Sequence, residues 1–284
     1  MSSSWSNVLS NYSKLKDPEI NELPKGVCLE FNNETLTIFD GFEKAKYHFL
    51  ILPRDPFPID LSKGEKPIPS NQLDSLSNLM KSPLKLKVLK SLEKQAERVK
   101  KMIQDEMKKD YKGFVWDVKI GFHAVESMKH VHLHVISSDM ISDRLKNKKH
   151  WNSFHPTLGF FLHLDEVIKQ VESNGTYQFK STPQYESLLK KDLNHPDSNN
   201  RNFKNLPELK KFLVEQFERD KRRAMKKIEE KEVRVEEEEK EGEGGLEVSN
   251  SNSNSKKREK SPPSPSTSSS EGTTLSSKKQ KKTD

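Results

Sequence analysis

The stretch that decides the fold is residues 127–139, Ser-Met-Lys-His-Val-His-Leu-His-Val-Ile-Ser-Ser-Asp. Its three histidines, His130, His132 and His134, alternate with aliphatic residues. Alternate residues of a strand point to the same face of a sheet, so the pattern predicts one face of imidazoles and one that enters the core. Imidazole titrates near neutral pH, and its two nitrogens can take separate roles. The row of histidines indicates a site for nucleophilic attack on phosphorus or for a metal ion.

Two alternatives compete with covalent catalysis at this row. A single histidine on a strand is usually a packed or solvated side chain, but three at alternate positions indicate a site. Histidines two apart on a strand can share a zinc ion, although a catalytic zinc site would add another ligand and a carboxylate base. Covalent chemistry needs one imidazole nitrogen free and the other held by a hydrogen bond, which backbone carbonyls of the strand can supply.

Composition divides the chain into a folded part and a tail. The 284 residues include 33% charged side chains and carry a formal net charge of +7. From about residue 231 the chain becomes acidic, then glycine-rich, then dominated by Ser, Pro, Asn and Lys, which predicts disorder because few apolar groups remain to offset ordering entropy. The basic clusters Lys256–Arg258 and Lys278–Lys282 fit nuclear-import signals, with solubilising charge as the alternative. We therefore expect a nuclear location.

Cysteine usage and hydropathy exclude several classes of protein. Cys28 is the only cysteine in the sequence, so internal disulfides and Cys-rich zinc modules are excluded and an intracellular location is favoured. No apolar stretch approaches the length needed to cross a membrane, and residues 1–5 lack the basic start of a secretory signal. The surplus of Lys and Arg suits a polyanionic partner, although basic proteins with solvated lysines are common. We expect a monomer with no membrane partner.

Periodicity and turn residues predict strands, a long helix, more strands and further helices, in this order. The expected helices are residues 4–16, 84–107, 165–172 and 206 to about 230. The expected strands are residues 26–31, 35–39, 46–52, 114–122 and 131–137. Residues 53–70 and 138–164 are expected to be loops. This order predicts an α+β fold with a largely antiparallel sheet.

The wider sequence resembles the histidine triad (HIT) superfamily and, within it, the aprataxin family. His-Val-His-Leu-His-Val-Ile matches the HIT motif of three histidines separated by hydrophobic residues. Residues 121–139 and the segment Leu-Lys-Asn-Lys-Lys-His-Trp-Asn-Ser-Phe at 145–154 resemble aprataxins more specifically, and residues 44–50 fit the family's early strand. The likeness covers roughly residues 1–220. It implies a HIT-like sheet, a C-terminal helical region and the disordered tail.

Four regions follow from this resemblance. They are an N-terminal helix at 1–22, the HIT catalytic domain at 23–164, a helical DNA-binding region at 165–230 and the tail at 231–284. Aprataxins typically carry a zinc finger in the third region, with two cysteines followed by His and then His or Glu on a helix. Here residues 193–198 contain no cysteine, and Phe212 and Gln216 stand at the later ligand positions. We expect a degenerate finger that keeps its helix and binds no metal.

Site residues also follow from the resemblance. His132 resembles a nucleophile that takes AMP as a covalent phosphoramidate, with His130 and His134 as its orienting and phosphate-binding neighbours and His48 as a further catalytic residue. Nucleotide binding is expected at Asp40, Lys44, His123 and Ser127. DNA binding is expected at Trp5, Lys46, Lys148, Lys149, Lys210 and Lys211. No cofactor is implied. Glu43 and Glu126 depart from the proline that family members often have.

The function implied is removal of AMP from 5′-adenylated DNA ends, which are abortive ligation intermediates, with RNA–DNA junctions and caps as related substrates. One alternative is a HIT hydrolase of small nucleotides such as dinucleoside polyphosphates. The aromatic N-terminal helix and basic C-terminal helix favour a long polyanion instead. Another alternative is a catalytically silent DNA-end-binding protein, against which the intact histidines argue. Trp5 either stacks on a base at the DNA end or anchors its helix to the core.

Overall fold

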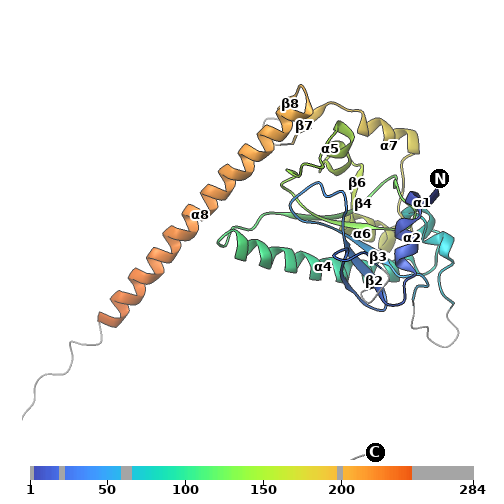
Figure 1. Cartoon of the computed structure of the whole chain (residues 1–284), viewed down its shortest axis with the longest axis horizontal. Coiled ribbons are helices and arrows are strands. Elements are labelled where there is room, and N and C mark those ends of the chain that lie inside the picture. The colour runs from blue at the N-terminus through green and yellow to red at the C-terminus, as the bar shows by residue number, and fades with distance from the viewer. Residues whose placement is uncertain (1–2, 19–22, 59–65, 197–200, 245–284) are drawn as a thin grey trace, which may run out of the picture. The chain divides into compact units, whose positions relative to one another are not determined.

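The structure, a computed structural model, describes residues 3–18, 23–58, 66–196 and 201–244 (Figure 1). The chain divides into two compact units, Met1–Val233 and Arg234–Asp284, and the strands of the described residues lie in the first. In the described ranges, no helix combines the length with the apolar character that a membrane span requires.

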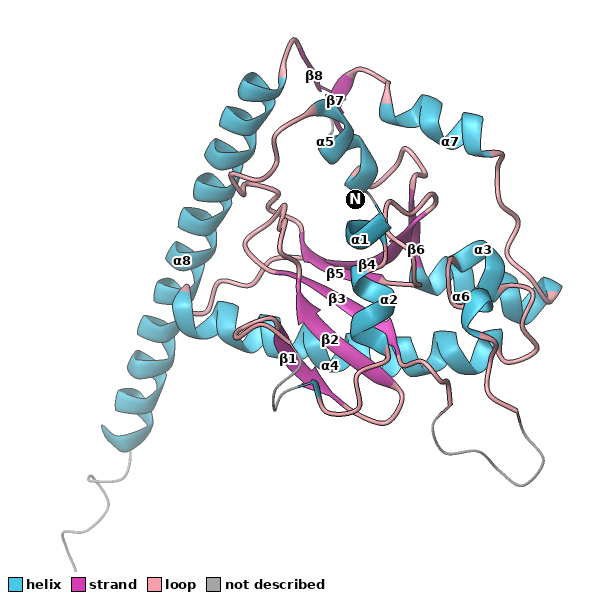
Figure 2. Ribbon diagram, turned by 45° about the vertical axis from the view of Figure 1, so that its right-hand side comes forward, coloured by secondary structure: helices cyan, strands magenta, loops and turns pink. Residues whose placement is uncertain are grey.

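A six-stranded antiparallel sheet forms the centre of the first unit (Figure 2). Its strands are β1 (Cys28–Phe31), β2 (Thr35–Phe39), β3 (His48–Pro53), β4 (Val118–His123), β5 (Leu133–Ser137) and β6 (Phe161–His163). The order is β1-β2-β3-β5-β4-β6, and every neighbouring pair is antiparallel. The predicted α+β class with a largely antiparallel sheet is confirmed. Because β5 is central, the histidine segment lies in the middle of the sheet.

The helix α4 (Lys85–Asp110) covers one face of this sheet and buries the stripe that the sequence predicted. Its buried apolar residues recur every three or four positions, as an amphipathic helix requires, and are Val88, Leu89, Leu92, Ala96, Val99, Ile103 and Met107. They pack with Leu133 and Val135 of β5 and with α6 (Leu164–Asn174). The alternation of β5 therefore sends Leu133 and Val135 toward α4 and leaves His134 on the other face.

Smaller elements cover that other face. The N-terminal helix α1 (Ser3–Ser6) precedes α2 (Val8–Ser13), which packs there through Leu9 against strand residues such as Leu50. A separate apolar cluster joins α5 (Lys148–Phe154), the hairpin of β7 (Leu193–His195) with β8 (Arg201–Phe203), and the start of α8 (Leu206–Gly244). The remaining helices are η2 (Ser70–Gln72), α3 (Leu76–Leu79) and α7 (Thr182–Leu189).

The expectation of a loop at residues 138–164 was wrong, because α5 and β6 lie within it. Asn147 begins α5 as its N-cap, since its side chain accepts a hydrogen bond from the backbone N–H of His150 at 3.0 Å. The expected strand at 114–122 starts only at Val118.

Differences also occur at both ends of the chain. The N-terminal helix is divided at Asn7 into α1 and α2. The helix α8 continues to Gly244, past its expected end near Glu230, because the Glu- and Lys-rich segment that follows consists of good helix formers. The expected disorder and basic clusters of residues 245–284 lie outside the described residues.

Candidate active site

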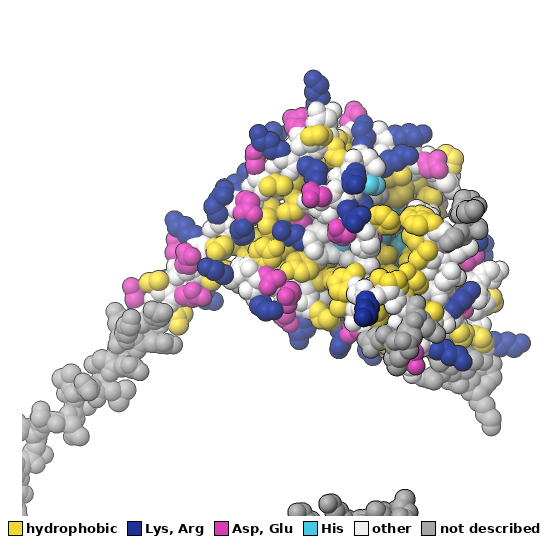
Figure 3. Space-filling model, viewed as in Figure 1, with side chains coloured by type: hydrophobic (Ala, Val, Ile, Leu, Met, Phe, Trp, Pro, Cys, Tyr) yellow, Lys and Arg dark blue, Asp and Glu magenta, His cyan; other side chains and the backbone are white. Residues whose placement is uncertain are grey.

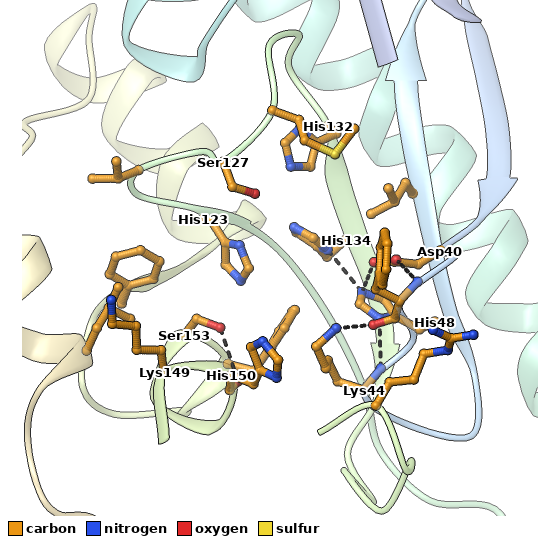
Figure 4. A pocket seen from close by; sticks show the side chains of 18 of the residues that line it. Asp40, Lys44, His48, His123, Ser127, His132, His134, Lys149, His150 and Ser153 are labelled. Carbon is orange, nitrogen blue, oxygen red and sulfur yellow. Dashed lines mark hydrogen bonds and ion pairs between the residues drawn. The ribbon is translucent and has the colours of Figure 1, made fainter. Parts of the chain in front are cut away.

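A pocket of about 560 Å³ opens on the histidine face of the sheet. His132 and His134 line it together with Leu50 of β3, while Trp5 and Leu9 approach from the N-terminal helices. Figure 3 shows histidine atoms within a hollow bordered by hydrophobic side chains, and Figure 4 shows the labelled polar side chains around it. The pocket brings together the triad segment, the β2–β3 loop and α5, which are far apart in the sequence.

His132 has the geometry of a nucleophile. Its Nδ1 lies 2.8 Å from the carbonyl oxygen of His130, so Nδ1 carries the hydrogen and Nε2 keeps its lone pair. His130 adopts a φ of 92°, which is unusual for a residue with a side chain. Its own Nε2 donates to the carbonyl oxygen of Pro53 at 2.7 Å. These are the bonds to backbone carbonyls that the sequence led us to expect, and they fix both imidazoles.

A chain of hydrogen bonds assigns the hydrogens on two further imidazoles. The backbone N–H of Lys44 donates to His48 Nδ1 at 3.3 Å, so the hydrogen of neutral His48 sits on Nε2. That Nε2 lies 3.0 Å from His134 Nδ1, which therefore accepts. The hydrogen of His134 must then be on its Nε2, a buried atom that has no hydrogen-bond partner among the described residues. His134 thus holds an N–H donor ready for an anionic ligand.

Burial keeps these imidazoles neutral. Desolvation lowers the pKa of His48 from 6.5 to about 4, against a smaller upward effect of the Asp40 charge. Desolvation also lowers the pKa of His130 to about 4, and it lowers the pKa of His132. For His134 the pKa is depressed well below 6.5, first by burial and then by neighbouring histidines. At neutral pH, His132 is therefore a free base rather than an imidazolium.

Asp40, His48 and His134 lie close enough to suggest a metal site, since one ligand atom from each falls within 4.8 Å of the others. A metal would need the lone pair of His48 Nε2. The hydrogen would then move to Nδ1 and face the Lys44 N–H that now donates to it. Metal-bound imidazoles normally donate their other N–H to an acceptor. The three residues therefore do not fit a metal ion.

The β2–β3 loop supplies two of the expected nucleotide-binding groups, Asp40 and Lys44. Asp40 Oδ1 accepts the backbone N–H of Phe42 at 2.7 Å, and its Oδ2 lies 3.4 Å from His48 Nε2. Lys44 lines the pocket, donates to the carbonyl oxygen of Phe42, and has its pKa lowered mainly by burial. His123 and Ser127 line the same pocket. His123 Nε2 is buried without a hydrogen-bond partner in the described part of the chain.

The expected DNA-binding residues separate into two groups. Trp5 and Lys149 line the pocket, and Trp5 is 51% exposed with its ring edge-on to Phe42. The other four lie elsewhere. Lys148 pairs with Asp192, Lys211 lies beside Glu215, Lys210 donates to the Ser142 carbonyl oxygen, and Lys46 sits over the rings of Tyr111 and Phe217. His130, one of the expected catalytic residues, does not line the pocket; it lines a small neighbouring cavity, which it shares with His132.

The sequence did not single out many of the residues that line the pocket. They are Leu9, Phe42, Leu50, Val125, Met128, Arg144, Lys146, His150, Ser153, Phe154, Phe160 and Leu189. Those on α5 had a detectable signal. Lys149, His150, Ser153 and Phe154 share one face of a helix, whereas Lys148 and Trp151 face another. Treating this segment as a loop hid that periodicity.

The hairpin β7–β8 and the start of α8 enclose an aromatic cluster. The ring of His195 stacks on Trp151 at 5.9 Å between centroids and meets Phe212 edge-on at 5.2 Å. Phe203 lies 5.1 Å from Phe212 and is buried. Trp151 also donates its indole N–H to the carbonyl oxygen of Asn194 at 3.0 Å. Aromatic packing, rather than a set of metal ligands, holds the hairpin against the helix.

Two family models match the chain. One, for the C-terminal binding region of scavenger mRNA decapping enzyme, matches residues 67–150, which include the histidine segment. The other, for the C2HE / C2H2 / C2HC zinc-binding finger, matches residues 157–219.

Curated relatives establish the family. An aprataxin-like protein of Saccharomyces cerevisiae is 33% identical over 184 residues, which cover 61% of this chain and 79% of the relative. The chain belongs to the aprataxin family. Aprataxin of Gallus gallus is 35% identical over 171 residues, covering 60% of this chain and 43% of the relative. A HIT domain-containing protein of Dictyostelium discoideum is 34% identical, and its match covers 52% of this chain and 33% of the relative. The chain thus spans less than half the length of these two relatives.

Solved structures of an aprataxin ortholog share the fold. The ortholog Hnt3 in complex with DNA superposes with a TM-score of 0.54 at 24% identity, covering 76% of this chain and 95% of that one. Hnt3 in complex with DNA and guanosine gives a TM-score of 0.54 at 23% identity, covering 76% and 97%. The expected aprataxin-type HIT fold is confirmed.

Aprataxins with a zinc finger need ligands that this chain lacks. The sequence contains no cysteine in residues 157–219, which match the finger model. Phe212, at the expected histidine position, instead contacts the rings of His195 and Phe203. A single imidazole packed between aromatic rings cannot provide a tetrahedral zinc site. The described residues therefore do not fit the metal, and Asp197 and Ser198 lie outside them.

Proposed function

We propose that the protein is a DNA-repair hydrolase that removes AMP from 5′-adenylated DNA ends through a covalent adduct on His132. The observation that carries the proposal is the tautomer of His132. Its Nδ1–H is held by the His130 carbonyl oxygen at 2.8 Å, which leaves Nε2 as a free base. The side chain lies in a pocket with buried N–H donors and a ribose-binding candidate, Asp40. Such an arrangement suits nucleophilic attack on an adenylate phosphorus.

In the first step, His132 Nε2 attacks the phosphorus of the adenylate. The N–P bond forms while the P–O bond to the DNA 5′-phosphate breaks, and the DNA leaves with the bonding electron pair. This leaving group is a weak base, so it needs little protonation. His134 Nε2–H is suited to donate to a phosphoryl oxygen as charge develops there. His123 and Lys44 are the further groups within the same pocket that can contact phosphate oxygens.

In the second step, water attacks the phosphorus of the adduct. The N–P bond breaks and its electron pair returns to His132 Nε2, so the imidazole departs neutral. AMP leaves, and the proton lost by water passes to solvent. The hydrogen bond from His132 Nδ1 to the backbone persists throughout and keeps the ring in place. None of these steps requires a metal ion, which agrees with the poor fit of Asp40, His48 and His134 to one.

DNA as the substrate is supported by the mouth of the pocket. Trp5 is half exposed there, and Lys146, Lys149 and Arg144 line the same pocket. Exposed aromatic and cationic groups together suit a nucleic-acid end, through stacking on bases and contacts to phosphates. The aprataxin ortholog Hnt3 was solved with DNA, and we extend that partner to this chain. We also propose a monomer in the nucleus.

Capped ends are a second candidate substrate. The match of residues 67–150 to a decapping-enzyme model favours this candidate, as does the complex of Hnt3 with DNA and guanosine. The same two-step chemistry would apply, with a guanylate in place of the adenylate. RNA–DNA junctions that carry an adenylate fit the proposal equally, because the chemistry occurs at the 5′-phosphate.

The test compares three substrates under single-turnover conditions. Nicked DNA with a 5′-adenylate should release AMP rapidly, nicked DNA with a 5′-guanylate more slowly, and diadenosine polyphosphate slowest. Equal or faster cleavage of the dinucleotide would favour the small-nucleotide hydrolase. Binding of adenylated DNA without any release of AMP would favour a silent end-binding protein. Either result would overturn the proposal.

A further inference from the structure

The helix α8 continues past residue 219, where the match to the finger model ends, and it contacts the segment between α4 and β4. Phe217 is buried against three aromatic rings of that segment. The centroid of its ring lies 5.0 Å from that of Trp116, 5.8 Å from Phe114 and 6.2 Å from Tyr111. Figure 2 shows α8 passing the end of α4 at this point. This contact is separate from the aromatic cluster around His195.

Lys46, in the β2–β3 loop, connects this aromatic contact with the residues of that loop that line the pocket. Its ammonium lies 5.6 Å from the centroid of the Tyr111 ring and 5.5 Å from that of Phe217. Its backbone N–H donates to Asp139 Oδ2 at 3.0 Å. The indole N–H of Trp116 donates to the other oxygen, Oδ1, of the same buried carboxylate at 2.9 Å. Phe217, Trp116, Asp139 and Lys46 therefore form a closed ring of contacts.

The contacts of Phe217, Trp116, Asp139 and Lys46 hold residues 44–48. This segment sets the tautomers of His48 and His134. Lys46 lies between Lys44, whose N–H donates to His48 Nδ1, and His48 itself. Tyr47 is also fixed, since its N–H donates to Ser137 Oγ at 3.1 Å, and Ser137 in turn donates to Asp139. A shift of residues 44–48 would weaken the bond that places the hydrogen on His48 Nε2. The N–H donor of His134 depends on that hydrogen.

We propose that Phe217 is a positioning residue, through which α8 fixes the Lys44–His48 segment for nucleotide binding and for the hydrolysis proposed above. Among the described residues, the ring contacts of Phe217 are with residues outside the pocket, so that it acts through Trp116 and Lys46. This role deepens the proposed function, because it makes the C-terminal helix part of the nucleotide site in addition to any contact with DNA.

The experiment compares Phe217→Ala with Phe217→Tyr and Val214→Ala. Tyrosine keeps the ring, and Val214 is an exposed residue one turn earlier on the same helix. Amide hydrogen exchange, binding of AMP by titration calorimetry, and AMP release from adenylated DNA are measured for each full-length variant. Phe217→Ala should speed exchange of the Lys46 and Lys44 amides and weaken AMP binding by about three- to tenfold. Phe217→Tyr should restore both, and Val214→Ala should change neither.

Three outcomes would overturn the inference. Slower turnover of DNA with unchanged AMP binding and unchanged exchange would make Phe217 a contributor to DNA binding only. Faster exchange spread evenly over the sheet would make it a general stabiliser of the fold. Identical behaviour of Phe217→Ala and wild type would remove any role. Hydrogen exchange needs no ligand, so failure of the proposed hydrolase activity can be distinguished from failure of this inference.

Discussion

The pocket and the finger-like hairpin surround their histidines with different contacts. In the pocket, the rings of His132 and His48 are fixed by hydrogen bonds to backbone groups. Each bond uses one ring nitrogen and determines what the other nitrogen offers. In the hairpin, His195 is held by the flat faces and edges of Trp151 and Phe212. Ring contacts of that kind do not select a tautomer.

This difference shows how one residue type comes to serve two purposes. Directional polar bonds in the pocket leave His132 Nε2 with a free lone pair and His134 Nε2 with a free N–H, as a phosphate-transfer site requires. Apolar burial in the hairpin contributes to the stability of the fold. The family model for a zinc finger matches this segment, whose described residues provide aromatic packing where the expected metal ligands are missing.

The largest expected effect is the difference in AMP release between variants of His132 and of His195. His132→Ala should lower AMP release by about a thousandfold or more, because the nucleophile is lost, while DNA binding persists. His195→Ala, the matched control, should change release little. Mass spectrometry of trapped wild-type protein should place the AMP adduct on His132. An adduct on His130 or His134 would refute the assignment, and equal losses in the two variants would break the comparison.

The second-largest expected effect is a decrease of the free energy of unfolding in acid. The pKa of His48 and that of His130 are about 4 in the folded chain, against 6.5 ordinarily. Above pH 6.5 the imidazoles of His48 and His130 are neutral in both the folded and the unfolded chain. As the pH falls from 6.5 to 4, the unfolded chain gains protons that the folded chain cannot, so the free energy of unfolding decreases. The loss is on the order of 3 kcal/mol per imidazole and levels off below pH 4.

Urea denaturation at several pH values between about 7 and 4 measures this loss. His48→Gln cannot titrate, so its stability should fall less steeply over that window than the stability of wild type. If the two slopes coincide, His48 does not remain neutral in the folded protein. The tautomer chain through His134 would then need to be reassigned.

The fold could be predicted from sequence wherever the two faces of an element carry different kinds of residue. The stripe of α4 marks its buried face, and the alternation of β5 separates Leu133 and Val135, which pack with α4, from His134 on the opposite face. α5 and β6 were missed because each is short, so that few residues carry the pattern, and because tertiary contacts bury them. The cap at Asn147 was a second local signal for α5, beside the shared face of its pocket residues. The extension of α8 was missed because an acidic run was taken as part of the tail.

The site could be predicted in part for a similar reason. The motif placed His132, His134, Asp40 and Lys44, and these four do line one pocket. Charge alone was a poor guide to the pocket mouth, because a surface lysine can turn toward any nearby carboxylate or ring. Lys148 pairs with Asp192 and Lys46 lies over Tyr111, and both partners are distant in sequence. Contacts of that kind are set by the tertiary fold.

If aromatic packing stabilises the hairpin in place of a zinc ion, removing the buried ring of Phe203 should lower the free energy of unfolding. Phe203 is buried in the aromatic cluster of the hairpin, so Phe203→Ala should lower the free energy of unfolding by about 2–4 kcal/mol. Phe39→Ala, at a ring that is 44% exposed, should cost less than about 1 kcal/mol. Elemental analysis should find no stoichiometric zinc, and a chelator should leave the unfolding midpoint unchanged. One zinc per chain, with unfolding in chelator, would contradict the packing account.

The next comparison is between the buried ring of Phe203 and the exposed ring of Trp5, which is available for a ligand. Trp5 is 51% exposed at the pocket mouth, unlike Phe203, and its ring meets that of Phe42 edge-on, with 6.1 Å between the centroids. Trp5→Ala should weaken binding to nicked or blunt DNA ends by roughly 1–3 kcal/mol. Stacking releases no counterions, so the salt dependence of binding should change little.

Lys149→Ala provides the contrast, because loss of a phosphate contact should reduce the salt slope by about one. Both variants should retain turnover of a small adenylated substrate, since His132 and the adenosine-binding part of the pocket remain intact. Fluorescence anisotropy over a range of salt concentrations measures both effects. If Trp5→Ala damages turnover of the small substrate as much as turnover of DNA, then Trp5 anchors α1 to the core. Its exposure would then have no bearing on DNA.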